Sequence, residues 1–276
     1  MKKTFALISI LFFAVMLALF GCNGGGDTPP DETDEEYSFD FDTYNAELRE
    51  RKDYIFDYLI TRHGSNYSHK FGFSVSAARI DKYLETGDQE YLDSALHQAK
   101  KCYEHLERSP DCFGISFAIH HYGLFNEYYS EELKAYAKKI FTETTVYGDR
   151  PSTTNHALML AVGTYLANQY FPGEIGTEYY GYDAVQTDDP TAEKTLYDIV
   201  NKYPITGVYE YNSDTYFICH FLPLLAIAEC SDDEVLATKA RMVLHNAIFT
   251  LAPIWLKGHT AVAKERCYQP YTAENE

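Results

Sequence analysis

Two polar side chains, Asn155 and His156, open a segment that is otherwise almost entirely apolar, running from Ala157 to Val162. The residues just before them, Ser152 to Thr154, are of types preferred at a helix N-cap, because their oxygen accepts a free backbone N–H. We therefore predict a helix that begins near Ser152 to Thr154. Its first turn would hold the amide and the imidazole, where the helix dipole and the free N–H groups favour an anion. A helix that is apolar on nearly all sides is packed all round, so polar groups at its start indicate a cavity with chemistry in it.

A second segment has the same organisation. Tyr211, Asn212 and Tyr216 lead into another apolar helix, expected over 213–229. In an array of helical hairpins the inner helices begin at the same rim. The two polar segments are therefore expected on the same side of the molecule.

The remaining pattern is helical throughout, with apolar residues at spacings of three and four. The predicted helices are 43–62, 73–86, 88–107, 114–128, 130–145, 153–171, 190–202, 213–229 and 232–252. Outer, amphipathic segments alternate with segments nearly free of charge, at a period of roughly 40–50 residues per hairpin. The sequence thus predicts an all-α protein, and we favour an α/α toroid over an open solenoid. Too few helices are present for a closed ring, so the ring is expected to be incomplete, and the domain 43–276 truncated at its C-terminus.

The first residues have the pattern of a secretory signal, with Lys2 and Lys3 before an apolar run that ends at Phe20. Leu19-Phe20-Gly21-Cys22 resembles a bacterial lipoprotein lipobox, which implies a signal peptide over 1–21, cleavage before Cys22 and lipidation of that thiol. An uncleaved membrane anchor is the alternative. Residues 22–42 are rich in glycine and acids and are expected to be a flexible tether. This organisation places the protein in the bacterial cell envelope, at the outer membrane or cell surface.

Composition excludes several classes of function. The net charge of −18 argues against nucleic acid as a partner. No nucleophile-elbow motif, phosphate-binding glycine loop or zinc pattern occurs, and we predict no metal and no cofactor. His120 and His121 would point about 100° apart on a helix, which favours packing over metal binding. Cys102 and Cys112 are a weak candidate for one disulfide.

Asn155-His156, followed some 55–60 residues later by a Tyr-Asn-Ser-x-Thr-Tyr segment, resembles heparinase II/III-like and alginate-lyase-like polysaccharide lyases, and in particular their α/α-toroid domain. The resemblance covers about 113–271. It implies β-elimination of a uronic-acid-containing glycan, with catalytic roles for Asn155, His156 and either Tyr216 or Tyr211. Asp214 stands where related sequences tend to have a proline, and the β-sandwich domain that usually follows is absent from the chain.

The residue types suit that reaction. An amide or a protonated imidazole neutralises the substrate carboxylate, and a tyrosine whose pKa is lowered by nearby cations moves the protons. Candidate substrate-binding residues are Arg62, His63, Arg150, Asn212, Arg266 and Tyr268. The 25 tyrosines and 17 phenylalanines, many of them between helices, are suited to stacking on sugar rings or to filling the core. The expected partner is an anionic polysaccharide, and the membrane is reached through Cys22.

Three alternatives remain open. Asn155 and His156 have a structural interpretation as a capping arrangement. A glycoside hydrolase on the same architecture needs two carboxylates, for which only Asp81, Glu210 and Asp214 are candidates. A lipoprotein that binds glycan without cleaving it fits the aromatic loops and the tether equally well, and convergence of the cationic residues on one cavity would favour the lyase over it.

Overall fold

The computed structural model describes residues 40–68, 71–144, 153–175, 191–207 and 217–251, with two short strands at 255–256 and 259–260. The all-α prediction is confirmed for these residues, which also include one hairpin in which β1 and β2 pair antiparallel. Each described helix overlaps a predicted one. The elements are α2 (Phe41–His63), α3 (Gly72–Thr86), α4 (Gln89–Arg108), α5 (Cys112–Phe125), η1 (Asn126–Tyr128), α6 (Glu131–Glu143), α7 (Thr154–Tyr170), α8 (Ala192–Thr206), α9 (Phe217–Cys230), α10 (Glu234–Leu251), β1 (Trp255–Leu256) and β2 (His259–Thr260).

Most helix starts are set by short polar side chains at the N-cap. Asp88 accepts the N–H of Glu90 at the start of α4, and Asp111 accepts the N–H of Gly114 at the start of α5. Ser130 and Thr191 cap α6 and α8 in the same way. These bonds satisfy backbone donors that a helix leaves without partners, which explains why the predicted starts lie close to the observed ones.

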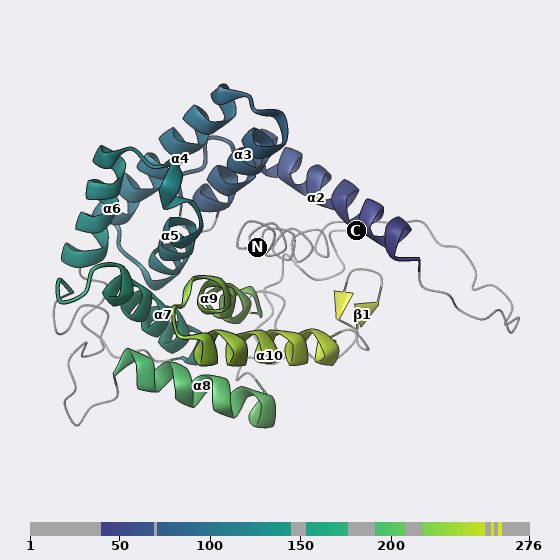
Figure 1. Ribbon diagram of the computed structural model, residues 1–276, viewed down its shortest axis with the longest axis vertical. Coiled ribbons are helices and arrows are strands. Elements are labelled where there is room, and N and C mark those ends of the chain that lie inside the picture. Colours follow the sequence, from purple (N-terminus) through teal and green to yellow (C-terminus); the bar gives the residue numbers. More distant parts are fainter. Residues whose placement is uncertain are drawn as a thin grey trace, which may run out of the picture.

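The helices are arranged in an arc (Figure 1). From α2 the chain passes through α3, α4 and α6, and α8 and α10 lie at the other end of the arc, with α5 and α9 inside it. Sequential partners pack together, α3 on α4, α7 on α8 and α9 on α10. The nearly charge-free helices α5, α7 and α9 are buried over most of their length, as expected for inner helices.

The three inner helices form the centre of the described core. α5, α7 and α9 pack against one another in all three pairings, so no open lumen separates α5 from α9. The buried side chains of these helices join those of α3, α4, α6, α8 and α10 in one continuous hydrophobic cluster.

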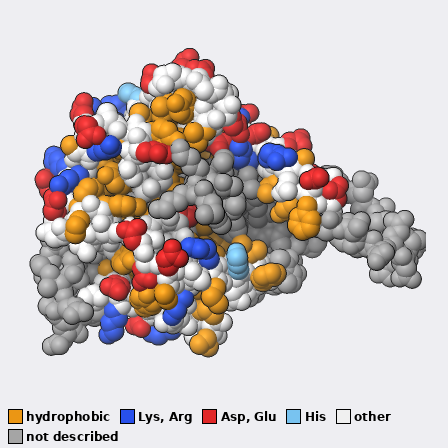
Figure 2. Space-filling view, in the orientation of Figure 1, with side chains coloured by type: hydrophobic (Ala, Val, Ile, Leu, Met, Phe, Trp, Pro, Cys, Tyr) orange, Lys and Arg blue, Asp and Glu red, His pale blue; other side chains and the backbone are white. Residues whose placement is uncertain are grey.

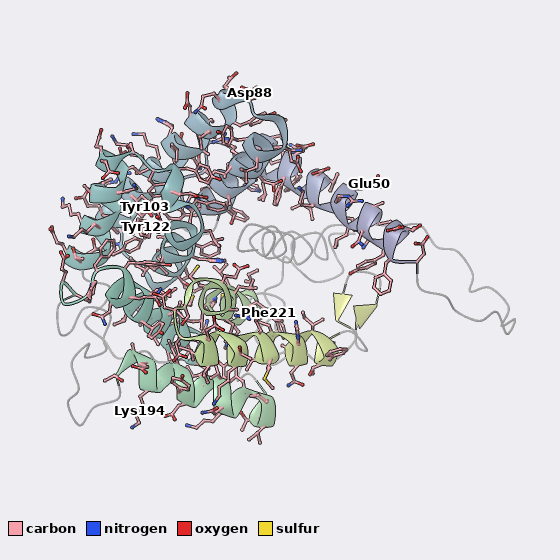
Figure 3. The ribbon with its side chains drawn as sticks, in the orientation of Figure 1. Glu50, Asp88, Tyr103, Tyr122, Lys194 and Phe221 are labelled. Carbon is pink, nitrogen blue, oxygen red and sulfur yellow. The ribbon has the colours of Figure 1, made fainter. Side chains whose placement is uncertain are left out.

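Aromatic rings fill the space between α4, α5 and α6. Tyr103 and Tyr122 (Figure 3) both lie edge-on to Phe141, with ring centroids 5.9 and 5.6 Å away. Edge-to-face pairs of this kind stabilise a core beyond the area they bury. Many aromatic residues of the described helices are therefore core residues, as one interpretation of the composition holds.

Two sequence predictions change in the structure. Cys102 and Cys112 are buried and in no disulfide, so the weak candidate for a bridge is not formed; burial raises the pKa of both thiols to about 12. The helix α2 begins at Phe41, two residues inside the segment expected to be a tether. Residues 1–39, with the predicted signal peptide and Cys22, lie outside the described residues. Among the helices that the structure describes, none is long and apolar enough to cross a membrane.

Candidate functional site

The inner helices α5, α7 and α9 run in the same direction. Near their starts, the ring of Phe113 on α5 meets the ring of His156 on α7 edge-on at 5.5 Å. Burial, the Asp111 carboxylate and the nearby Cys219 thiol on α9 raise the pKa of Cys112. At the opposite end, Gly123 of α5 lies against residues of the last turns of α7 and α9. The amino-terminal ends of the three helices therefore meet at one end of the bundle, as expected from the hairpin pattern.

Asn155 lies in the first turn of α7 with none of its surface exposed. Its Oδ1 accepts a hydrogen bond from the hydroxyl of Thr153. Its other amide atom, Nδ2, has no hydrogen-bond partner among the described residues. A buried polar atom without a partner costs on the order of 1–3 kcal/mol, so this amide is a candidate for a ligand or a water molecule.

The start of α7, like that of α3, has no side-chain cap. Thr153 is the N-cap residue, and the helix begins at Thr154 as predicted, but the side chain of Thr153 caps no backbone N–H. Its hydroxyl is directed to Asn155 instead. The first turn of α7 therefore has no side-chain cap from Thr153, and the positive end of the helix dipole lies beside Asn155.

His156 is partly buried beside Asn155, with its ring against Phe113. An imidazole in this position is fixed by packing and retains some access to solvent. It is therefore the residue of the first predicted segment that a substrate can approach from outside, whereas Asn155 is fully buried.

Several predicted site residues lie outside the described residues: Tyr211, Asn212, Tyr216, Arg150, Arg266, Tyr268 and Cys22. The helix that follows Tyr216 directly in the chain, α9, begins at the same end of the bundle as α7. The start of α9 therefore lies at the same end of the bundle as Asn155 and His156.

The predicted cationic residues of α2 lie in a different part of the fold. Arg62 is exposed, and the ring of His63 stacks on Phe71 at 4.3 Å with an angle of 4° between planes. The main packing partner of α2 is α3, whereas α7 packs on α5, α8 and α9. The structure does not bring Arg62 and His63 together with His156.

Asp81, the described candidate acid for a hydrolase, is a buried ion-pair residue. Its Oδ2 accepts a hydrogen bond from Lys52 Nζ at 2.8 Å. Burial raises the pKa of Asp81 and the lysine partly offsets that increase. Glu210 and Asp214 lie outside the described residues, so Asp81 is the one predicted acid whose surroundings the structure describes.

Sequence reasoning missed a second polar pair in the core. Nε2 of His120 on α5 lies 2.7 Å from Oε2 of Glu229 on α9, and both side chains are about nine-tenths buried. The signal was present, because Glu229 is the one acid in an otherwise uncharged helix. The two partners are 109 positions apart in the chain, so the sequence alone does not indicate that they pair.

The charged surface and the metal-ligating residues give no further candidate. On the face shown in Figure 2, acidic and basic side chains are intermixed rather than gathered into one basic area. Among the residues that the structure describes, no group of three or more His, Cys, Asp or Glu side chains could hold a metal ion.

Fold and site together define a helical-array protein with polar groups at the amino-terminal end of its inner helices. Comparisons of the chain with protein-family models, with curated proteins and with solved structures found no match.

Proposed function

We propose that the protein is a lipid-anchored envelope protein that acts on polysaccharide, and that it cleaves a uronic-acid-containing glycan by β-elimination. The reaction would take place where α7 and α9 begin. The observation that carries this proposal is the buried Asn155 amide with its free Nδ2, at the end of the bundle where both helices start. The resemblance to heparinase II/III-like and alginate-lyase-like enzymes and the lipobox at Cys22 give the substrate class and the location.

The roles follow from the chemistry of each group. Asn155 Nδ2, at the positive end of the α7 dipole, would neutralise the uronate carboxylate. His156 would assist proton transfer, and Tyr216 or Tyr211, from the segment just before α9, would take the C5 proton and protonate the leaving oxygen. Because Asn155 is buried, the uronate carboxylate would have to reach below the protein surface at the start of α7 to contact its Nδ2.

The proposal includes the architecture of an incomplete α/α toroid. The arc of inner and outer helices supports it. The direct packing of α5 on α9 makes the described part more compact than an open ring.

The test is an elimination assay on a panel of uronic-acid polymers. The carbon–carbon double bond left on the product absorbs in the ultraviolet, so its appearance reports elimination and not hydrolysis. We expect His156→Gln and Tyr216→Phe to lower the rate by about 100-fold or more. His97→Gln, a change at an exposed histidine of α4, is the matched control. Full activity in His156→Gln would contradict the proposed site.

A second candidate is a glycan-binding lipoprotein without catalytic activity. The separation of Arg62 and His63 from α7 favours it, since a lyase for an anionic polymer benefits from a positive cleft. Calorimetric binding of a polymer that yields no unsaturated product would select this candidate. Absence of both binding and product over the whole panel would contradict both.

A further inference from the structure

A recess lined mainly by apolar side chains, four of them phenylalanines, lies between α2, α3, α5 and α9. Its walls include Phe56 of α2, Phe73 of α3 and Phe117 and Phe125 of α5, together with His120 and His121. The recess has a cavity volume of about 50 Å³. Apolar recesses with a few polar groups are the usual form of a small-molecule site.

The two histidines in this wall differ in the hydrogen bonds that they make. The Ser76 hydroxyl donates to the carbonyl of Ala95 and therefore accepts from Nε2 of His121 at 2.9 Å. Nδ1 of His121 then accepts from the hydroxyl of Tyr129 at 2.7 Å. Both ring nitrogens are engaged, so His121 has no hydrogen-bonding capacity left for a ligand.

His120 has one nitrogen in use. Its Nε2 bonds to Oε2 of Glu229 at 2.7 Å, whereas its Nδ1 has no hydrogen-bond partner among the described residues. A carboxylate on one ring nitrogen fixes the orientation of an imidazole and makes the other nitrogen available. The second oxygen of Glu229, Oε1, is buried and also lacks a partner in the described part of the chain. The pair is thus not fully satisfied by the protein.

We propose that the recess is a binding site for the hydroxyl-bearing end of a phenolic ligand, with His120 Nδ1 as its hydrogen-bond partner and the phenylalanines as its walls. The site is separate from the proposed elimination site. His156 is in the first turn of α7, whereas Glu229 is the next-to-last residue of α9, at the other end of the parallel inner helices.

Two observations select this ligand class. A hydroxyl can both donate and accept a hydrogen bond. It therefore satisfies Nδ1 of His120 whether or not that nitrogen carries a hydrogen. The volume of the recess is smaller than the ~150 Å³ cavity known to hold benzene. Only the hydroxyl-bearing edge of one ring therefore fits inside, and the rest of the ring packs against the phenylalanines of the wall.

The experiment compares phenol with toluene, in which a methyl group replaces the hydroxyl, by calorimetric or NMR titration of the purified protein. His120→Gln is the test variant, because the Gln side-chain nitrogen can take the place of Nε2 and keep the bond to Glu229, while the Nδ1 position is lost. We expect it to weaken phenol binding by about ten-fold or more, as for the loss of one buried hydrogen bond, and to change toluene binding by less than about two-fold.

Ala77→Leu and His97→Gln locate the effect. Ala77 lines the recess, so a larger side chain there should block both ligands, whereas His97→Gln on the outer face of α4 should change neither. Failure of either ligand to bind the unmodified protein would overturn the proposal. The proposal would also be overturned if His120→Gln weakened the binding of phenol and toluene equally, or left phenol binding unchanged. Binding of either ligand to Ala77→Leu with unchanged affinity would overturn it as well.

Discussion

Gly123 on α5 lies directly against the sulfur of Cys230 on α9: a Cβ atom at residue 123 would lie 2.5 Å from Cys230 Sγ and 3.0 Å from its Cβ. The absence of a side chain at this position allows the two inner helices to touch. We expect Gly123→Ala to lower the free energy of unfolding by about 1–3 kcal/mol, as for other overpacked cores. Urea denaturation followed by circular dichroism measures this change.

The double variant Gly123→Ala, Cys230→Ala separates a steric effect from a change in helix propensity. A Cβ atom at residue 123 would also lie 2.5 Å from the Tyr170 hydroxyl on α7. Removal of the sulfur relieves one of these two closest contacts, so the double variant should be more stable than the sum of the two single changes predicts. Additive effects would show that the contact with Cys230 is not the source of the destabilisation.

Lys52 and Asp81 form a buried ion pair between α2 and α3, with 6% and 1% of the two side chains exposed. We expect Lys52→Met to cost about 3–5 kcal/mol, because it leaves the Asp81 carboxylate buried without its partner. The double variant Lys52→Met, Asp81→Leu should recover most of that loss. Lys100→Met, which removes an exposed pair with Glu132, is the control and should cost less than about 1 kcal/mol. Equal costs for Lys52→Met and Lys100→Met in denaturation would contradict the assigned role.

His121 predicts a pH dependence of stability. Burial, with a smaller contribution from His120, lowers its pKa from 6.5 to about 3. The unfolded chain therefore binds a proton that the folded protein does not bind over this interval. The contribution of His121 is complete above pH 6.5 and is lost as the pH falls toward about 3, at about 1.4 kcal/mol per pH unit.

The measurement is the free energy of unfolding at pH 6.5, 5.5 and 4.5 for the unmodified protein and for His121→Gln. The variant should be less stable at pH 6.5, since it loses bonds to Ser76 and Tyr129, and its stability should fall less steeply with decreasing pH. Burial also lowers the pKa of His220, to about 4. Its contribution to the pH dependence of stability is the same in the unmodified protein and in His121→Gln. Parallel slopes would show that His121 is not kept neutral by the fold.

The sequence predicted the helices well because their signals are local. Caps such as Asp88 and Asp111 and the apolar spacing are properties of neighbouring residues. The shared end at which α5, α7 and α9 begin also followed from the alternation of buried and amphipathic segments. The direct packing of α5 on α9 was not predictable in this way, because it depends on one small residue, Gly123, meeting Cys230 far along the chain.

The candidate site was predictable only in part. Asn155 and His156 are neighbours in the chain, and the helix start that holds them is a local feature. The burial of Asn155 was not evident from the sequence. Whether the first turn of a helix is exposed or covered depends on elements distant in the chain, which the residues of that turn do not specify. The pairing of His120 with Glu229 depends on tertiary packing for the same reason.

Asn155 also provides a test of function against stability. Leu has nearly the shape of Asn and no polar atoms, and Asn155→Leu removes the buried Nδ2 that has no partner in the described part of the chain. We expect the free energy of unfolding to stay the same or rise by about 1 kcal/mol, and the elimination activity proposed above to be lost. A gain in stability together with a loss of activity is typical of a group that is retained for function at a cost in stability.

The contrary outcome is that Asn155→Leu lowers the free energy of unfolding by more than about 2 kcal/mol while activity per folded molecule is kept. In that case the bond between Thr153 and Asn155 is structural. The capping interpretation of this helix start then holds, and His156 alone remains of the first predicted segment.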